Sequence, residues 1–230
     1  MGRFNKLAAS NKNLKKGFII AGILLGFVLP MLLMVCRENL PASFYISENF
    51  ILKNLGMILS YAYSVSIYLY AGLFICSVIY TEMQTTAVIA LPFVFYNLVN
   101  MLYMIVTYNS VVGGAFWTLS LFIIAIILMP VLWYLVIKLI SLIKMPDAAK
   151  IIISAIPVFI IMDWTYVWDI TALLINDASG NMTEIISILS NRLVPFVLCM
   201  ICAAFLYVIM NDIVNRKEIH EDLKKKSKKN

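Results

Sequence analysis

Charge is scarce in this chain of 230 residues, because only 13% of the residues are charged whereas 63% are hydrophobic. Soluble domains are about half apolar and about one quarter charged. A water-soluble fold of this size buries only about three quarters of its unfolded surface, so it would leave much of this apolar surface in water. The composition therefore excludes soluble globular, disordered and collagen-like proteins and indicates a polytopic membrane protein.

Residues that carry chemistry are also few. The single histidine, His220, lies in a charged tail, so a zinc site is not expected. Cys199 and Cys202 form a CxxC pattern inside an apolar run, where the surroundings disfavour the reactive thiolate, and we interpret them as packing residues. Cys36 and Cys76 imply no disulfide framework. Because the chain also lacks GxSxG, HExxH and phosphate-binding glycine motifs, we expect no enzyme activity, no catalytic residues, no cofactor and no metal.

Long apolar runs are what the chain does have. A hydrocarbon core of ~30 Å needs about 20 apolar helical residues, and six runs are long enough. The predicted spans are residues 17–36, 55–80, 85–107, 114–137, 151–174 and 193–210. The sequence therefore predicts an all-α integral membrane bundle of six transmembrane helices over residues 17–214. A basic cytoplasmic leader (residues 1–16) precedes the bundle, and a charged cytoplasmic tail (residues 215–230) follows it.

The first span resembles a secretory signal peptide in its basic lead, but its apolar stretch exceeds the usual 7–15 residues and no small-residue cleavage motif follows. We expect it to remain as the first helix. All but three of the 18 basic residues lie in the leader, the loop at residues 138–150 and the tail. Because positive residues stay in the cytoplasm, both termini are predicted there. The same residues favour anionic lipid headgroups as partners. Nucleic acid is not expected, since no aromatic-lined groove accompanies them.

Two carboxylates within the fifth span are the most unusual feature. A charged group inside the bilayer is costly, so Asp163 and Asp169 are candidate functional residues. A helix that begins at residue 151 places Asp163 near the midplane and directs Asp169 about 120° away from it, so the two cannot share one proton. A packing role is the alternative for Asp163, and Asp169 also suits the outer aromatic belt.

Polar side chains of the second and third spans are the candidate partners of these carboxylates. They predict either a polar cavity or hydrogen bonds that hold the helices together. Together with Asp163 and Asp169, Asn97 and Asn100 make the candidate intramembrane polar or ion site. The other polar residues are Ser60, Tyr61, Tyr63, Ser64, Ser66, Tyr68 and Tyr70 in the second span, and Tyr96 and Tyr103 in the third.

Two segments resemble Yip1-like membrane proteins, including bacterial members of that family. One is YTEMQTTAVIALPFVFYNLVNML at residues 80–102, a polar hairpin that enters a helix with a central proline. The other is LWYLVIKLISLIKMPDAAKIIISAIPVF at residues 132–159, in which an aromatic-led helix is followed by a short loop. The resemblance implies a non-catalytic helical membrane protein with a role in trafficking or in the cell envelope.

The topology is also similar to that of ABC-2 type exporter permeases, which have six helices, both ends inside and a basic leader. This second resemblance implies a subunit that works with a separate ATPase. The leading hypothesis is a non-enzymatic multi-pass protein of Yip1-like type that acts through helix packing and protein partners. The alternative is an exporter permease subunit, coupled to an ATPase or to an ion at Asp163. The residue usage favours a bacterial cytoplasmic (plasma) membrane as its location.

Overall fold

The computed structural model describes residues 12–45, 49–108, 115–162 and 193–212, and these ranges are helical and contain no strand. The all-α prediction is therefore confirmed for the described chain. Five helices in it are long and apolar enough to cross a membrane. They are Leu14–Glu38, Leu55–Tyr80, Met83–Tyr103, Ile123–Leu142 and Leu193–Asp212.

The fifth predicted span is described only in its first part. Helix α9 (Asp147–Met162) covers the start of that span, and residues 163–174 lie outside the described ranges. The number of six spans and the position of both termini therefore stay predictions. The loop predicted at residues 138–150 is shorter than expected, because α8 (Ala115–Leu142) continues past Lys138. A lysine is tolerated there because its long side chain can carry the ammonium group to the interface.

The first span is one rod with a wide turn in its middle. Helix α2 (Lys12–Ile23) leads into a π-helical segment, η1 (Leu24–Val28), which leads into α3 (Leu29–Glu38). The backbone N–H of Leu29 donates to the carbonyl of Leu24, five residues back. Pro30 follows directly, and a proline inside a helix removes one N–H and crowds the preceding turn. The wide turn is a local accommodation to this proline.

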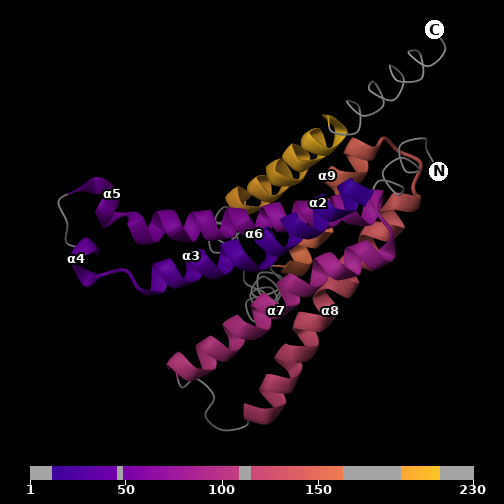
Figure 1. Cartoon of the computed structure of the whole chain (residues 1–230). Helices are drawn as coiled ribbons and strands as arrows, with labels where there is room; N and C mark the ends of the chain where they lie inside the picture. The colour runs from indigo at the N-terminus through magenta and orange to yellow at the C-terminus, as the bar shows by residue number, and fades with distance from the viewer. Residues whose placement is uncertain (1–11, 46–48, 109–114, 163–192, 213–230) are drawn as a thin grey trace, which may run out of the picture.

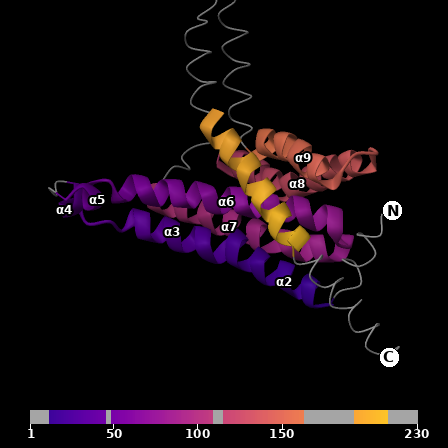
Figure 2. The same cartoon turned by 90° about the horizontal axis from the view of Figure 1, so that it is seen from above.

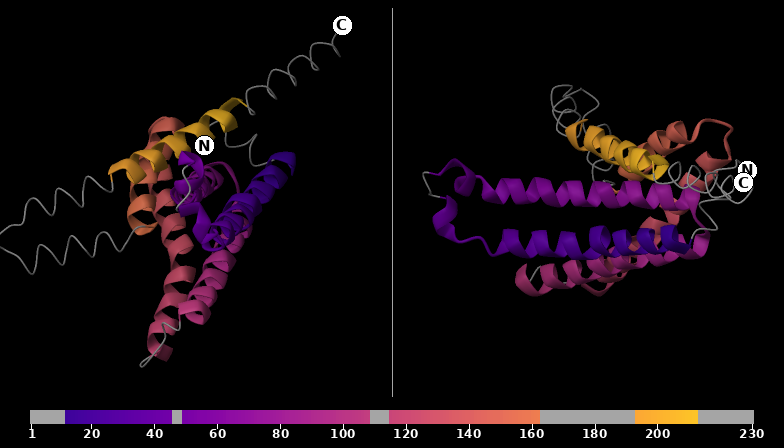
Figure 3. Two further views of the ribbon diagram at one scale, coloured as in Figure 1. Left: turned by 90° about the vertical axis from the view of Figure 1, so that its left-hand side faces the viewer. Right: turned by 45° about the horizontal axis from the view of Figure 1, so that its top comes forward.

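Helix α6 (Leu55–Tyr80) is the centre of the bundle. Figures 2 and 3 show α2 and α3 on one side of α6, and α9 with the C-terminal helix Leu193–Asp212 on the other. Every residue from Tyr70 to Val78 is buried. Small residues permit this close packing, since a Cβ on Gly72 would lie 3.0 Å from Cα of Ala203. An apolar helix with neighbours on all sides is the arrangement expected of a core helix.

An aromatic cluster joins α6 to α7 (Met83–Tyr108) and α8. The rings of Tyr70 and Phe93 stack with centroids 4.8 Å apart, and Trp133 contacts Phe74 and Phe93 at 5.6 and 5.5 Å. The Tyr70 hydroxyl donates to the carbonyl of Ile89 at 3.0 Å. That carbonyl lies in the turn of α7 that precedes Pro92, so the hydroxyl supports a helix that the proline weakens.

The two long helix pairs diverge from this core. Figure 1 shows α3 beside α6 running toward one end of the molecule, where the short helices α4 (Ala42–Tyr45) and α5 (Phe50–Lys53) connect them. Helices α7 and α8 run side by side in a different direction, as the left view of Figure 3 also shows. At the opposite end, Lys15 Nζ lies 2.8 Å from Glu82 Oε1 and ties the first span to the turn between α6 and α7.

Candidate functional site: a polar cavity between four helices

A cavity of about 260 Å³ lies between α6, α7, α8 and α9. Its polar lining comes from α6 and α7, and its apolar lining includes one residue of α8 and two of α9. The polar and tyrosine side chains are Tyr63, Ser64, Tyr68, Tyr96 and Asn97. The apolar side chains are Ile67, Phe93, Met129, Phe159 and Met162. The cavity therefore joins hydroxyl and amide groups to aromatic and thioether surfaces.

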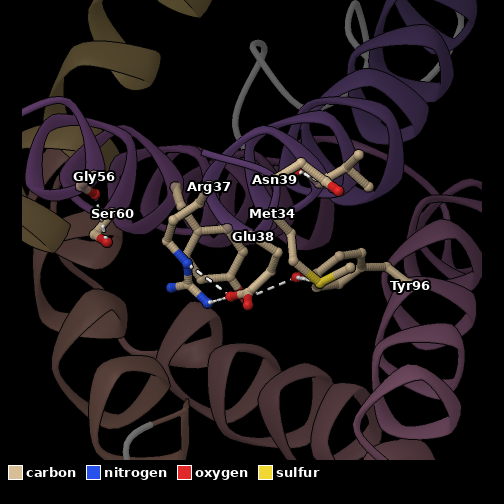
Figure 4. Close-up of polar contacts among 9 residues, drawn as sticks. Met34, Arg37, Glu38, Asn39, Gly56, Ser60 and Tyr96 are labelled. Atoms are coloured by element: carbon tan, nitrogen blue, oxygen red, sulfur yellow. Dashed lines mark hydrogen bonds and ion pairs between the residues drawn. The ribbon is translucent and has the colours of Figure 1, made fainter. Parts of the chain in front are cut away.

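Two tyrosines connect α6 and α7 at this cavity. The Tyr96 hydroxyl donates to the Tyr63 hydroxyl at 2.9 Å, and the ring centroids are 6.3 Å apart. The Tyr96 hydroxyl also lies 4.0 Å from Sδ of Met34 on α3. Figure 4 shows the side chains of Tyr96 and Met34 close together. Tyr96 is 1% exposed. Among the described residues, Tyr63 and Met34 are the partners that orient its hydroxyl. Because the Tyr63 oxygen accepts the proton of Tyr96, the hydroxyl proton of Tyr63 itself points away from Tyr96.

A charge pair lies beside these phenols at the end of α3. Arg37 Nε donates to Oε1 of Glu38 at 3.1 Å, and its Nη2 donates to the same oxygen. Figure 4 places this pair next to the hydroxyl end of Tyr96. Arg37 is close enough to Tyr63 and Tyr96 to interact with both electrostatically. Because the two charges neutralise each other, the pair adds polarity near the cavity without adding net charge.

Asn97 is the predicted site residue that the structure places in the cavity lining. Its Nδ2 donates to the carbonyl of Phe93 at 2.8 Å, and its Oδ1 accepts no hydrogen bond from the described residues. Asn100 is half-buried one turn further along α7 and is not among the described residues that line the cavity. The amide of Asn97 therefore retains hydrogen-bonding capacity that a water molecule or a ligand can meet.

Asp163 and Asp169 lie outside the described residues, so their predicted role stays a prediction. Met162 is the last described residue of α9 and lines the cavity. Asp163 follows it directly in the sequence.

The remaining sequence hypotheses concern cysteines and metals. Cys76, Cys199 and Cys202 are buried and Cys36 is exposed, and all four are free thiols. Within the described ranges, no three metal-binding side chains come together. The packing role of Cys199 and Cys202 and the expected absence of a metal stay predictions.

Several residues in the cavity lining, and two charged residues close to it, were not among the sequence-based candidates. Phe159, Met129 and Met162 read as ordinary apolar residues of a membrane span, and Arg37 and Glu38 read as charges of an external loop. A signal was available for the last two, because a charge pair that ends an apolar helix must find polar neighbours. For the apolar residues there was no signal, since lipid-facing and cavity-facing positions have the same composition.

No protein-family model, curated protein or solved structure matches this chain. The described helices define a helical membrane protein with a cavity lined by polar and apolar side chains among its helices. Such a cavity can bind and orient a small solute.

Proposed function

We propose that this chain is the membrane subunit of a transport system, a permease whose solute pathway passes through the cavity between α6, α7, α8 and α9. The observation that carries the proposal is the polar lining of that cavity, in particular Tyr63, Ser64 and Asn97. Polar groups inside a membrane protein are costly, and they commonly mark substrate pathways.

The packing around the cavity supports this proposal. The residues of α6 from Tyr70 to Val78 form a closely packed core, whereas the cavity lies in the half of α6 that contains Tyr63 and Ser64. One half of the bundle is therefore closely packed, and the other contains a cavity large enough to hold a small solute. Transport by alternating access requires a combination of a fixed body with a site between helices that move against each other.

The test is whether position 64 can be reached by water from both sides of the membrane. We suggest Ser64→Cys in a chain that also carries Cys36→Ser, because Cys36 is the exposed native thiol. A membrane-impermeant maleimide is applied to intact cells and to inverted vesicles. ATP and a proton gradient are supplied separately, so that the energy source is identified. A permease predicts labelling from both faces under at least one of these conditions.

Ser154→Cys in the same background is the matched control, because Ser154 is fully buried in α9 and does not line the cavity. It should remain unlabelled from either face. If the thiol at position 64 is labelled from one face only, or from neither, under every condition, the chain does not alternate access and the permease proposal is wrong.

A second candidate function is an action through a protein partner without transport. It is favoured by an apolar crevice of about 220 Å³ between α7 and α8, which includes the small residues Ala87 and Ala90 beside Pro130. Small residues let another helix approach closely in a membrane. Ala87→Phe should then dissociate a partner complex on a native gel of solubilised membranes. The neighbouring Val88→Phe, which lies outside the crevice, should leave the complex intact.

A further inference from the structure

The cavity has two chemically different walls. Tyr63, Ser64 and Asn97, which carry hydroxyl and amide groups, belong to the polar wall on α6 and α7. Phe159 and Met162 of α9 belong to the apolar wall. Tyr68 joins the two walls, since its ring lies 6.3 Å from the ring of Phe159. A ligand that satisfies both walls needs one polar end and one apolar, preferably planar, body.

The polar wall retains hydrogen-bonding capacity that the described protein does not use. Tyr63 accepts from Tyr96, and its own hydroxyl proton donates to none of the described residues. Ser64 Oγ donates to the carbonyl of Ser60 at 3.1 Å, so its lone pairs remain as acceptors. Asn97 retains one N–H and its Oδ1. A single hydroxyl or carbonyl group on a ligand can meet these donors and acceptors.

The charge of the lining restricts the ligand further. None of the described residues that line the cavity is an aspartate, glutamate, lysine, arginine or histidine. The nearby Arg37 and Glu38 are paired with each other, so neither offers a free counter-charge. An ion that left water for this cavity would lose its hydration without a partner of opposite sign. The described part of the lining therefore favours a ligand without net charge.

The volume gives the size of the part of a ligand that the cavity can hold. A dry cavity of about 150 Å³ is sufficient for benzene, and drug-sized ligands occupy about 300–1,000 Å³. The cavity of about 260 Å³ lies between these limits. It has room for one aromatic ring with a short side chain.

We infer that this cavity is a binding site for a small neutral amphipathic molecule, with one planar apolar ring and one hydroxyl or carbonyl group. The ring packs between the aromatic and methionine side chains of α7, α8 and α9, and the polar group contacts Tyr63 and Asn97. The inference rests on the proposed function, because it takes the cavity as the solute site of the permease.

Three probes of the same size separate the contribution of charge. 2-Phenylethanol is neutral, phenylacetate is an anion and 2-phenylethylamine is a cation at pH 7, and all three have the same ring and a similar linker. Binding of each radiolabelled probe to the purified full chain in lipid nanodiscs is measured by equilibrium dialysis, with empty nanodiscs as the reference. We expect saturable binding of 2-phenylethanol and at least tenfold weaker binding of both ions.

Tyr63→Phe removes the hydroxyl and keeps the ring, so it should weaken binding of 2-phenylethanol about three- to tenfold, the size of one hydrogen bond. Tyr61→Phe is the matched control, because Tyr61 lies on the same helix, is 60% exposed and does not line the cavity. The Tyr61→Phe variant should bind 2-phenylethanol with the affinity of the wild-type chain. If Tyr63→Phe does not fold, Asn97→Leu is the second variant of the cavity. It should also weaken the binding of 2-phenylethanol.

The inference is overturned if 2-phenylethanol shows no saturable excess over empty nanodiscs, or if either ion binds as tightly. It is also overturned if the cavity variants bind like Tyr61→Phe. These outcomes are distinct from a failure of the proposed function. Labelling of the Ser64→Cys thiol from one face only, together with normal probe binding, would refute transport and leave the binding site. Labelling from both faces without probe binding would refute the ligand class alone.

Discussion

The contact between Gly26 and Tyr70 provides the sharpest test of the packing. A Cβ at position 26 would lie 2.7 Å from Cε2 and 2.9 Å from Cδ2 of Tyr70. The Tyr70 ring is fully buried, is stacked on Phe93, and is held by the hydrogen bond to the carbonyl of Ile89. Because the ring has no free direction in which to move, we expect Gly26→Ala to destabilise the protein.

The magnitude follows from two opposing effects. Overpacking of a tightly packed interior costs about 1–3 kcal/mol, whereas replacing glycine by alanine inside a helix gains about 1 kcal/mol. Gly17→Ala has only the gain, because nothing lies within 4 Å of a Cβ at that position. The two variants should therefore differ by about 1–3 kcal/mol. For a chain of this length, that difference corresponds to roughly 2–12 °C in the unfolding temperature.

The assay is thermal unfolding of the detergent-solubilised full chain, followed by size-exclusion chromatography after heating. The double variant Gly26→Ala with Tyr70→Leu isolates the contact, because leucine has no atoms where the ring edge lies. Substitution of Gly26 should then cost less than it does in the wild type, with a coupling energy of about 0.5–3 kcal/mol. If Gly26→Ala is as stable as Gly17→Ala, the described packing of η1 against α6 is wrong.

The remaining predictions concern charge, a buried hydroxyl and topology. Glu82→Gln removes the partner of Lys15. Because both side chains are partly exposed, the variant should lower the free energy of unfolding by less than about 1 kcal/mol, and the difference should disappear in high salt. A larger loss that does not depend on salt, measured by thermal unfolding, would contradict this. Ser154→Ala should leave the unfolding temperature unchanged or raise it, since the Ser154 hydroxyl is buried without a hydrogen-bond partner among the described residues; a marked decrease would show that the hydroxyl has one. Reporter fusions at the two ends should both report the cytoplasm, and reporters on opposite faces would overturn the predicted topology.

Part of the cavity was accessible to sequence reasoning. The polar side chains of the second and third spans are unusual in apolar runs, and five of those tyrosine, serine and asparagine residues line the cavity. Others in the same set have different surroundings. Tyr61 is 60% exposed, whereas Tyr70 is fully buried in the aromatic core. Composition shows which residues are polar, but it does not show which face of the helix has a neighbour.

The apolar wall of the cavity was not accessible in this way. In water-soluble helices an apolar stripe identifies the buried face, but in a membrane the lipid-facing side is also apolar. Leu91 and Phe95 of α7 are exposed to the surrounding medium, whereas Phe93 between them lines the cavity and contacts the core. Nothing in the sequence distinguishes these three positions.

The sequence by itself determined the helical class and the approximate positions of the five long apolar helices found among the described residues, because these depend only on the length and composition of each apolar run. The tertiary structure alone decided which side chains meet. Tyr96 contacts Met34, which is 62 residues away in the sequence, and Gly26 packs against the ring of Tyr70 on another helix. Such contacts depend on the rotation of each helix about its own axis. Helix packing sets that rotation, and uniformly apolar runs do not encode it locally.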